Sequence, residues 1–265
     1  MNIHFTDIEL FKRLRKSTLV EIEIGSKMYG LEHKDSDTDI LCIYTTADCE
    51  LNSFHMTHHQ LQFKRDNIDY IFVNIHNFLR NCMNGDSTIN FEVINSEKLK
   101  GTCLEFLYNM RKSFYNYKIM RSYLGFAKRD LKHVYIDGKT EFDKNKKIAH
   151  AYRGYIFASK ILKNMDIFIN DTWITYIKDI IWVIEDYIER NKEIYTISSC
   201  IDKLRKELNK ELDDDNLTTF MKVEEQIKLD KELLNLINSD LYKNKKMVNF
   251  NMTMIYDANE NGIKY

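Results

Sequence analysis

One stretch constrains this chain more than any other: a glycine turn and a pair of aspartates lie between two short apolar runs. The first run, Thr18–Ile24, ends at Gly25-Ser26, and the second run, Ile40–Tyr44, begins directly after Asp39. Both runs are rich in β-branched residues and have the length of strands, which predicts strands over residues 18–25 and 38–45. Because glycine has no Cβ and tolerates positive φ, a Gly-Ser turn lets the backbone approach a phosphate closely.

Two carboxylates mark the start of the second predicted strand. Asp37 and Asp39 lie two residues apart, and side chains along a strand alternate with a period of two, so both carboxylates point to the same face. Oxygen ligands on a rigid element suit Mg²⁺, which takes one or two protein carboxylates together with phosphate oxygens. The stretch therefore predicts a site for a magnesium-bound phosphate compound.

A family resemblance rests on this stretch. The pattern G-S-x-x-x-G followed by S-D-x-D is formed by Gly25-Ser26, Gly30 and Ser36–Asp39. It resembles the signature of nucleotidyltransferases of the DNA polymerase beta superfamily. With Tyr29 before Gly30 it is most similar to the predicted nucleotidyltransferases of RNA-repair gene clusters, the RlaP-like group. The resemblance implies an α+β fold, with a small mixed β-sheet domain followed by an α-helical domain.

A third carboxylate, Asp69, opens an aromatic and β-branched strand, Ile68–Val73. That strand and Leu61–Lys64 flank a plausible hairpin turn. A carboxylate buried there without a cation would be costly, so it faces solvent, caps the turn or meets a metal. The family pattern has a third carboxylate on a neighbouring strand, and Asp69 holds that position. By resemblance, the catalytic residues and the ligands of two Mg²⁺ ions are Asp37, Asp39 and Asp69.

The spacing of apolar residues along the chain changes near residue 100. Beyond it, long helical periodicity with few glycines predicts a boundary between a nucleotidyltransferase domain, residues 1–100, and a helical domain, residues 101–265. The strictly alternating residues 248–254 predict a C-terminal strand. Helices are predicted near residues 6–16, 26–33, 103–116, 118–135, 143–163, 172–191, 199–212 and 217–239.

Positive charge is concentrated in the middle of the chain. Residues 101–165 hold 14 Lys and Arg against 5 Asp and Glu, a net charge of +9, whereas the whole chain has a net charge of −1. A basic segment between acidic flanks attracts a triphosphate or a nucleic-acid backbone. The alternative is that each lysine or arginine solvates an exposed helix face.

Within that segment, Lys147, His150 and Arg153 form a K-x-x-H-x-x-R pattern that resembles one in the same family. Successive i+3 positions share one helix face, so these side chains could hold a triphosphate across a cleft from the aspartates. The alternative is an ordinary solvated basic face. The implied nucleotide-binding residues are Gly25, Ser26, Lys147, His150 and Arg153.

Two further features stay open. Glu92 matches a glutamate of the RlaP-like stretch, but a helix cap or a salt bridge explains it equally well. His55, His58 and His59 lie close together, yet no fourth ligand stands at a spacing typical of a metal site. A solvated loop or strand edge is therefore the favoured interpretation of the three histidines.

The chain also lacks the marks of export. No apolar run approaches the roughly 20 residues that span a bilayer, and the N-terminus has no basic region followed by an apolar core. Five cysteines without a C-x-x-C pair suggest neither a disulfide framework nor a thiolate zinc site. We therefore expect a cytoplasmic protein with no membrane partner.

The function implied by the resemblance is transfer of a nucleoside monophosphate from an NTP, such as ATP, to a hydroxyl acceptor. The gene-cluster resemblance favours an RNA end as that acceptor, for instance the end of a tRNA. A protein or small-molecule adenylyltransferase, of the antitoxin or antibiotic-modifying kind, is the alternative, because the same triad serves those reactions. A non-catalytic nucleotide-binding module is disfavoured, since all three carboxylates are present.

Overall fold

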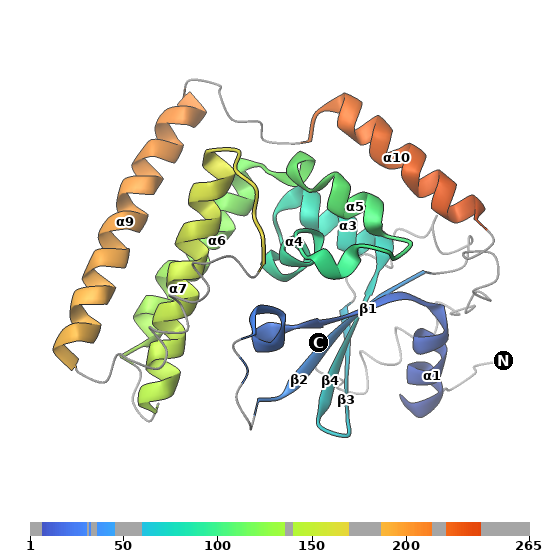
Figure 1. Ribbon diagram of the computed structural model, residues 1–265, viewed down its shortest axis with the longest axis horizontal. Coiled ribbons are helices and arrows are strands. Elements are labelled where there is room, and N and C mark those ends of the chain that lie inside the picture. Colours follow the sequence, from blue (N-terminus) through green and yellow to red (C-terminus); the bar gives the residue numbers. More distant parts are fainter. Residues whose placement is uncertain are drawn as a thin grey trace, which may run out of the picture.

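The computed structural model describes residues 7–30, 32, 36–45, 60–135, 140–169, 187–213 and 221–239. It is an α+β structure in which one small mixed sheet is followed by helices (Figure 1). The predicted fold class is confirmed. The predicted strand at 248–254, most of the helix at 172–191 and the three histidines at 55–59 lie outside the described residues.

The sheet contains four strands in the order β1-β2-β4-β3. Their bounds are β1 Thr18–Ile24, β2 Thr38–Tyr44, β3 Gln60–Arg65 and β4 Ile68–Asn74. The first and last pairs are antiparallel, and β2 runs parallel to β4 with Asp39 directly beside Asp69. Asp66 and Asn67 both have positive φ, as a two-residue hairpin turn requires. The four strands predicted within residues 18–73 are confirmed.

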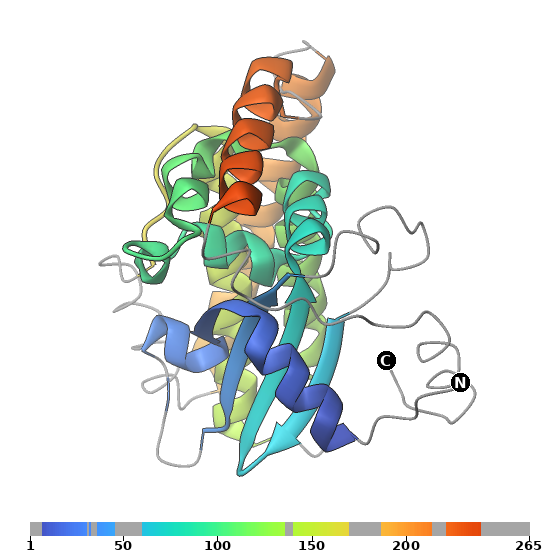
Figure 2. The same ribbon diagram turned by 90° about the vertical axis from the view of Figure 1, so that its right-hand side faces the viewer.

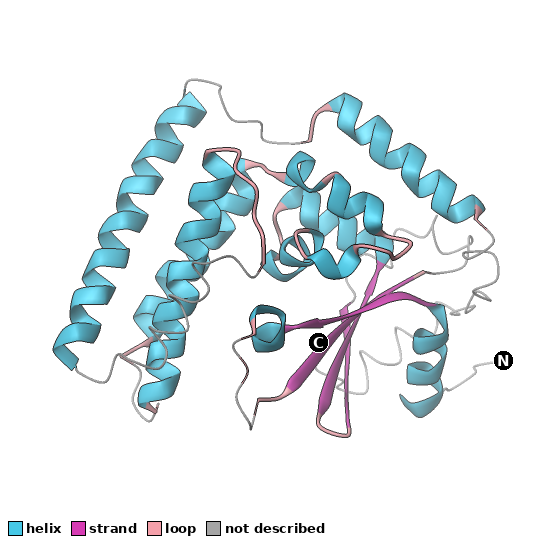
Figure 3. Ribbon diagram, in the orientation of Figure 1, coloured by secondary structure: helices cyan, strands magenta, loops and turns pink. Residues whose placement is uncertain are grey.

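The two faces of the sheet pack against different partners. Cys42, Tyr44 and Phe72 face α1 (Asp7–Ser17), which lies across the strands in Figure 2. The other face, with Leu41 and Val73, packs into the main core under the remaining helices. Figure 3 shows these layers. Since side chains alternate along a strand, Asp39 and Asp69 lie on the face that is turned toward the main core.

The turn after β1 is tight. It forms a single 3₁₀ turn, η1 (Gly25–Tyr29), which ends at Gly30 in the left-handed region with φ 60°. The helix predicted over residues 26–33 is therefore shorter than expected. Glycine supplies the positive φ at both ends of the turn, since Gly25 has φ +66°.

The remaining helical elements follow in chain order. They are α3 Ile75–Asn84, α4 Thr88–Ile94, η2 Glu97–Leu99, α5 Glu105–Asn109, η3 Arg111–Phe114, α6 Tyr117–His133, α7 Glu141–Leu162, α9 Tyr187–Asp213 and α10 Val223–Asn238. No helix in this described set combines the length and the apolar character needed to cross a bilayer.

The single helix predicted over residues 103–116 is wrong. It is divided into α5 and η3: the Ser113 N–H donates to the Met110 carbonyl at 2.9 Å, a bond of the 3₁₀ type, and Arg111 Nη1 donates to the Tyr108 carbonyl at 3.0 Å. The buried Asn116 then accepts a hydrogen bond from the Ile119 N–H at 3.1 Å. That bond caps α6 and ends the preceding segment.

Helices α6 and α7 form a tightly packed pair beside the sheet, and α9 packs against both of them (Figure 1). A Cβ at Gly154 would meet the Tyr123 carbonyl oxygen at 3.0 Å, so a glycine there permits the close approach of the two helices. The main core runs without a break from β1 to α9. The domain division at residue 100 stays a prediction.

Candidate active site

A cavity of about 700 Å³ lies between the start of β2 and the α6–α7 pair. The sheet side contributes Gly25, Ser26, Ser36, Asp37 and Asp39, and the helical side contributes Phe126, Arg129, Lys146, Lys147, His150 and Arg153. The structure thus brings seven of the eight predicted site residues to one cavity. The eighth, Asp69, lies beside Asp39 in the parallel register but does not line this space.

Gly25 and Asp39 are in close contact. The register of β1 and β2 pairs Ile24 with Asp39, so the turn that follows Ile24 passes over the aspartate. A Cβ at Gly25 would stand 2.6 Å from Asp39 Oδ2, which is closer than non-bonded atoms can approach. The glycine is therefore required for two reasons, its positive φ and its missing side chain.

The three aspartates repel one another. The pKa of Asp39 is raised by partial burial, then by the negative charges of Asp69 and Asp37, while Lys146 and Lys64 oppose the shift. Asp37 and Asp69 thus both lie within electrostatic reach of Asp39. Repulsion of this kind is relieved by a bound cation, which the carboxylate oxygens at the cavity are suited to hold.

Asp69 already has a partner. Its Oδ1 atom lies 3.8 Å from Lys64 Nζ, and both side chains are well exposed. Among the described residues, no three His, Cys, Asp or Glu side chains converge into a ready-made metal cluster. Asp37 and Asp39 nevertheless fit Mg²⁺, which takes one or two carboxylates and completes its shell with phosphate and water oxygens. The set of three metal ligands stays a prediction.

Arg153 is not on a solvated face. It is only 9% exposed, its guanidinium lies 4.2 Å from the centre of the Tyr29 ring, and Nη2 lies 3.6 Å from Glu92 Oε1. Burial, the largest single influence, lowers the pKa of Arg153, but the charges of Glu92, Tyr29, Tyr123 and Asp130 together outweigh it and the pKa is raised. The solvated-face alternative is wrong for this residue.

Glu92 is the salt-bridge partner that the sequence left open. It is 4% exposed and lies on α4, and besides Arg153 it accepts a hydrogen bond from the Tyr123 hydroxyl at 3.3 Å. One buried carboxylate therefore joins α4, α6 and α7. Through Arg153 and Tyr29 it also reaches the 3₁₀ turn that carries Gly25 and Ser26.

Lys147 and His150 share a second buried carboxylate, Asp130 of α6. Asp130 is 0% exposed, its Oδ1 lies 3.2 Å from Lys147 Nζ, and its Oδ2 lies 3.6 Å from His150 Nδ1. Burial lowers the pKa of His150 to about 4, although Asp130 acts in the opposite direction. His150 is therefore neutral at pH 7 and adds no positive charge to the cavity.

A family model for the RNA repair pathway DNA polymerase beta family, RlaP, matches residues 5–235. The match covers most of the chain, including both sides of the cavity. The chain belongs to this family. Neither the search of curated proteins nor the search of solved structures finds a match. The family recognised from the Gly25 to Asp39 stretch is confirmed, and the chain is a member of a polymerase beta-like nucleotidyltransferase family.

Sequence reasoning missed three residues of the site in this RlaP member. Lys146 and Arg129 line the cavity, and neither makes an ion pair with another described residue, whereas Lys147 is paired. The third is Asp130, a buried carboxylate that contacts Lys147 and His150. Lys146 could have been noticed in the sequence, because it stands directly before Lys147, the first residue of the motif. Only the packing of α6 on α7 shows that Lys147, and not Lys146, contacts the Asp130 carboxylate.

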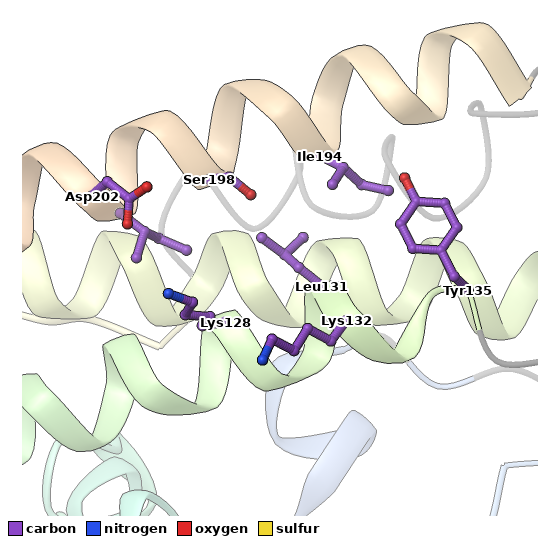
Figure 4. A pocket seen from close by; sticks show the side chains of 8 residues that line it. Lys128, Leu131, Lys132, Tyr135, Ile194, Ser198 and Asp202 are labelled. Atoms are coloured by element: carbon purple, nitrogen blue, oxygen red, sulfur yellow. The ribbon is translucent and has the colours of Figure 1, made fainter.

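A second cavity of about 410 Å³ lies between α6 and α9 (Figure 4). Leu131, Ile194 and Ile201 form an apolar floor, and Lys128 and Asp202 stand among the polar residues around it. No predicted site residue lines this space. The RlaP signature therefore coincides with the polar cavity beside the sheet.

Proposed function

We propose that this RlaP family member is a metal-dependent nucleotidyltransferase that transfers a nucleoside monophosphate from an NTP to a hydroxyl at an RNA end. The observation that carries the proposal is the contact of the Gly25 turn with Asp39 inside a cavity that basic side chains face. A turn that permits close backbone approach, beside Asp39 with its raised pKa, suits a magnesium-bound triphosphate.

Asp37 and Asp39 would hold Mg²⁺, with Asp69 as a third ligand. Once bound, the cation would offset the charge that develops on the phosphate oxygens during in-line displacement. The oxygen of the attacking hydroxyl bonds to the α-phosphorus, and the bond from that phosphorus to the leaving pyrophosphate oxygen breaks. Asp69 is the candidate acceptor of the hydroxyl proton, because it lies directly beside Asp39 in the register of the two parallel strands.

The chain's own groups would bind and orient the triphosphate. Gly25 and Ser26 offer backbone and hydroxyl donors at the turn, and Lys146 and Arg129 offer positive charge from the opposite wall. Lys147 is partly neutralised by Asp130, and Arg153 by Glu92. The free cations are therefore fewer than the motif suggests, and Lys146 and Arg129 would carry most of the attraction for phosphate.

The RNA acceptor is supported by the family's RNA repair pathway and by the net charge of +9 over residues 101–165. The experiment is incubation of the whole chain with Mg²⁺, each α-phosphate-labelled NTP in turn, and one of three acceptors: total tRNA, a protein lysate or an aminoglycoside. RNA whose 3′ end has been oxidised with periodate is the matched control, because it lacks the acceptor hydroxyls.

Label on intact RNA and not on oxidised RNA would support the proposal. Label on protein or on the aminoglycoside would favour the adenylyltransferase alternative. If nucleotide binds but no acceptor is labelled, and the Asp39→Asn variant behaves like the wild type, the chain is a binding module and the proposed reaction is wrong.

A further inference from the structure

Asp130 carries no role in the reaction proposed above, yet it is a fully buried carboxylate behind the cavity wall. Burial of a charge without partners is costly, so such a group persists only with compensating contacts. Its two contacts are Lys147 and His150, both from the neighbouring helix α7 and both lining the cavity. Asp130 therefore acts on the cavity through these two side chains.

The two oxygens of Asp130 have different partners. Oδ1 accepts a hydrogen bond from Lys147 Nζ at 3.2 Å, whereas Oδ2 lies 3.6 Å from His150 Nδ1. Among the described residues Oδ2 has no hydrogen-bond partner, and a buried carboxylate oxygen is stabilised by a donor, so a proton on the histidine nitrogen that faces it is the favourable arrangement. The other ring nitrogen, Nε2, is then an acceptor.

The other groups around His150 oppose a second proton. Arg153 and Lys147 are cations whose charges lower the pKa of His150, in the same direction as its burial. The ring also lies nearly parallel to Phe126, with centroids 6.2 Å apart and an interplanar angle of 27°. His150 is therefore a neutral imidazole that two residues of α6, Asp130 and Phe126, hold in one orientation.

We infer that Asp130 is a positioning residue that fixes the Nδ1–H tautomer of His150, so that Nε2 accepts a hydrogen bond from an N–H or O–H donor of the bound nucleotide. The donor would be the exocyclic amine of the base or a hydroxyl of the ribose. A phosphate oxygen is excluded, because it is itself an acceptor. The choice of a nucleotide as ligand rests on the proposed function, whereas the tautomer does not.

The tautomer can be measured directly. ¹⁵N NMR of the imidazoles in the whole chain distinguishes a protonated ring nitrogen from an unprotonated one, and the His150→Gln variant assigns the His150 signals. At pH 7 we expect a protonated Nδ1 and an unprotonated Nε2. A protonated Nε2, or a doubly protonated ring, would overturn the inference whether or not the chain transfers nucleotides.

The Asp130→Asn variant tests whether Asp130 sets the tautomer of His150. Lys147 Nζ needs an acceptor at the Oδ1 position, so the amide NH₂ of the asparagine would occupy the Oδ2 position and donate to Nδ1. The proton of His150 should then move to Nε2. The Lys147→Met variant is the matched control, because it leaves the contact of Asp130 with His150 intact and should keep the wild-type tautomer. An unchanged tautomer in Asp130→Asn, or a changed one in Lys147→Met, would contradict the inference.

Nucleotide affinities test whether Nε2 of His150 accepts a hydrogen bond from the bound nucleotide. The affinity of the preferred NTP is compared, without acceptor, with its 2′-deoxy and 3′-deoxy forms and with the form that lacks the exocyclic amine. The analogue that lacks the donor should bind the wild type roughly 3- to 10-fold more weakly. It should lose nothing further in His150→Phe, which keeps an aromatic ring beside Phe126.

Equal losses for every analogue in the wild type and in His150→Phe would overturn the nucleotide contact. If no NTP binds at all, the proposed function and the contact both fail, while the tautomer measurement still decides the role of Asp130. Circular dichroism of each variant separates a lost contact from a lost fold.

Discussion

The two sides of the cavity differ in how their charged side chains are paired. On the sheet side, Asp37, Asp39 and Asp69 are partly exposed carboxylates that repel one another, which raises the pKa of Asp39. On the helical side, buried carboxylates already pair with the basic residues: Asp130 with Lys147, and Glu92 with Arg153. Among the described residues, Asp37 and Asp39 thus have no ion-pair partner and Asp69 has only an exposed one, Lys64. On the helical side, the motif cations Lys147 and Arg153 are already paired within the protein.

This difference teaches that a basic motif on a helix does not by itself measure the positive charge that faces a ligand. In the sequence, Lys147, His150 and Arg153 look like three cations on one face. In the fold, His150 is neutral, and Lys147 and Arg153 are paired with buried carboxylates. The motif therefore lines the cavity but adds little positive charge to it. On the sheet side the correction is smaller: Asp69 has an exposed lysine partner 3.8 Å away, and Asp37 and Asp39 make no ion pair with another described residue.

The largest effect is expected on the sheet side. Asp39→Asn should lower the rate of nucleotide transfer roughly a thousand-fold, equivalent to about 4 kcal/mol of activation free energy, because it removes a ligand for the cation. Asp86→Asn, an exposed position outside the cavity, is the control and should keep full activity. Initial rates at saturating Mg²⁺ measure the effect. A fully active Asp39→Asn variant would contradict the proposed metal-dependent mechanism.

The next effect concerns stability on the helical side. Glu92→Gln leaves the Arg153 cation buried without its carboxylate and should lower the free energy of unfolding in urea by about 3 kcal/mol. Combining it with Arg153→Met should recover part of that loss, because neither charge then remains. Glu97→Gln breaks an exposed ion pair of 2.6 Å and should change nothing measurable. Equal losses in the two glutamate variants would mean that burial does not distinguish these pairs.

Gly25→Ala tests the contact that joins turn and carboxylate. It should cost about 2 kcal/mol or more of stability, from backbone strain and from the clash with Asp39. Gly101→Ala is a matched control, because Gly101 has φ +73° but no atom within 4 Å of the added Cβ, so it carries the strain alone, about 1 kcal/mol. Thermal unfolding compares the two. Identical losses would show that the clash with Asp39 is relieved at no cost.

A smaller effect should identify the cation that is available to phosphate. Lys146→Met should raise the KM for NTP roughly ten-fold, about 1.4 kcal/mol, and should weaken its dependence on salt. Lys163→Met, at the far end of the same helix, should leave KM unchanged. If Lys147→Met raises KM more than Lys146→Met does, the pairing with Asp130 does not withhold charge from the ligand.

The smallest effect is a pH dependence of stability. Because the pKa of Asp39 is raised in the folded state, its contribution to stability is fully present below the unfolded pKa and is lost as the pH rises through the folded pKa. The difference in free energy of unfolding, Asp39→Asn minus wild type, should therefore grow from pH 4 to pH 7. Added Mg²⁺ should reduce that difference at pH 7. A difference that shrinks as the pH rises would contradict the repulsion among the three aspartates.

The success of sequence reasoning depended on the range of the interactions involved. The strands and the glycine turn follow from period-two alternation and glycine geometry, which are local. Asp37 lies just before β2 (Thr38–Tyr44), so the common face of Asp37 and Asp39 stays a prediction. The failure at residues 103–116 has a different origin, since Arg111 and Asn116 end the helical pattern through particular hydrogen bonds that composition does not reveal. Glu92 was noticed, but its partner lies 61 positions further along the chain.

The sequence by itself determined the family, the strand-turn-strand unit and the carboxylate pair at its end, because short-range backbone geometry fixes where those atoms point. Only the tertiary structure decided which charges remain for a ligand. The packing of α6 on α7 and of α4 on α6 buries Asp130 and Glu92 against the basic motif. Burial strengthens electrostatic pairing and shifts pKa values, and burial is a property of the folded chain as a whole.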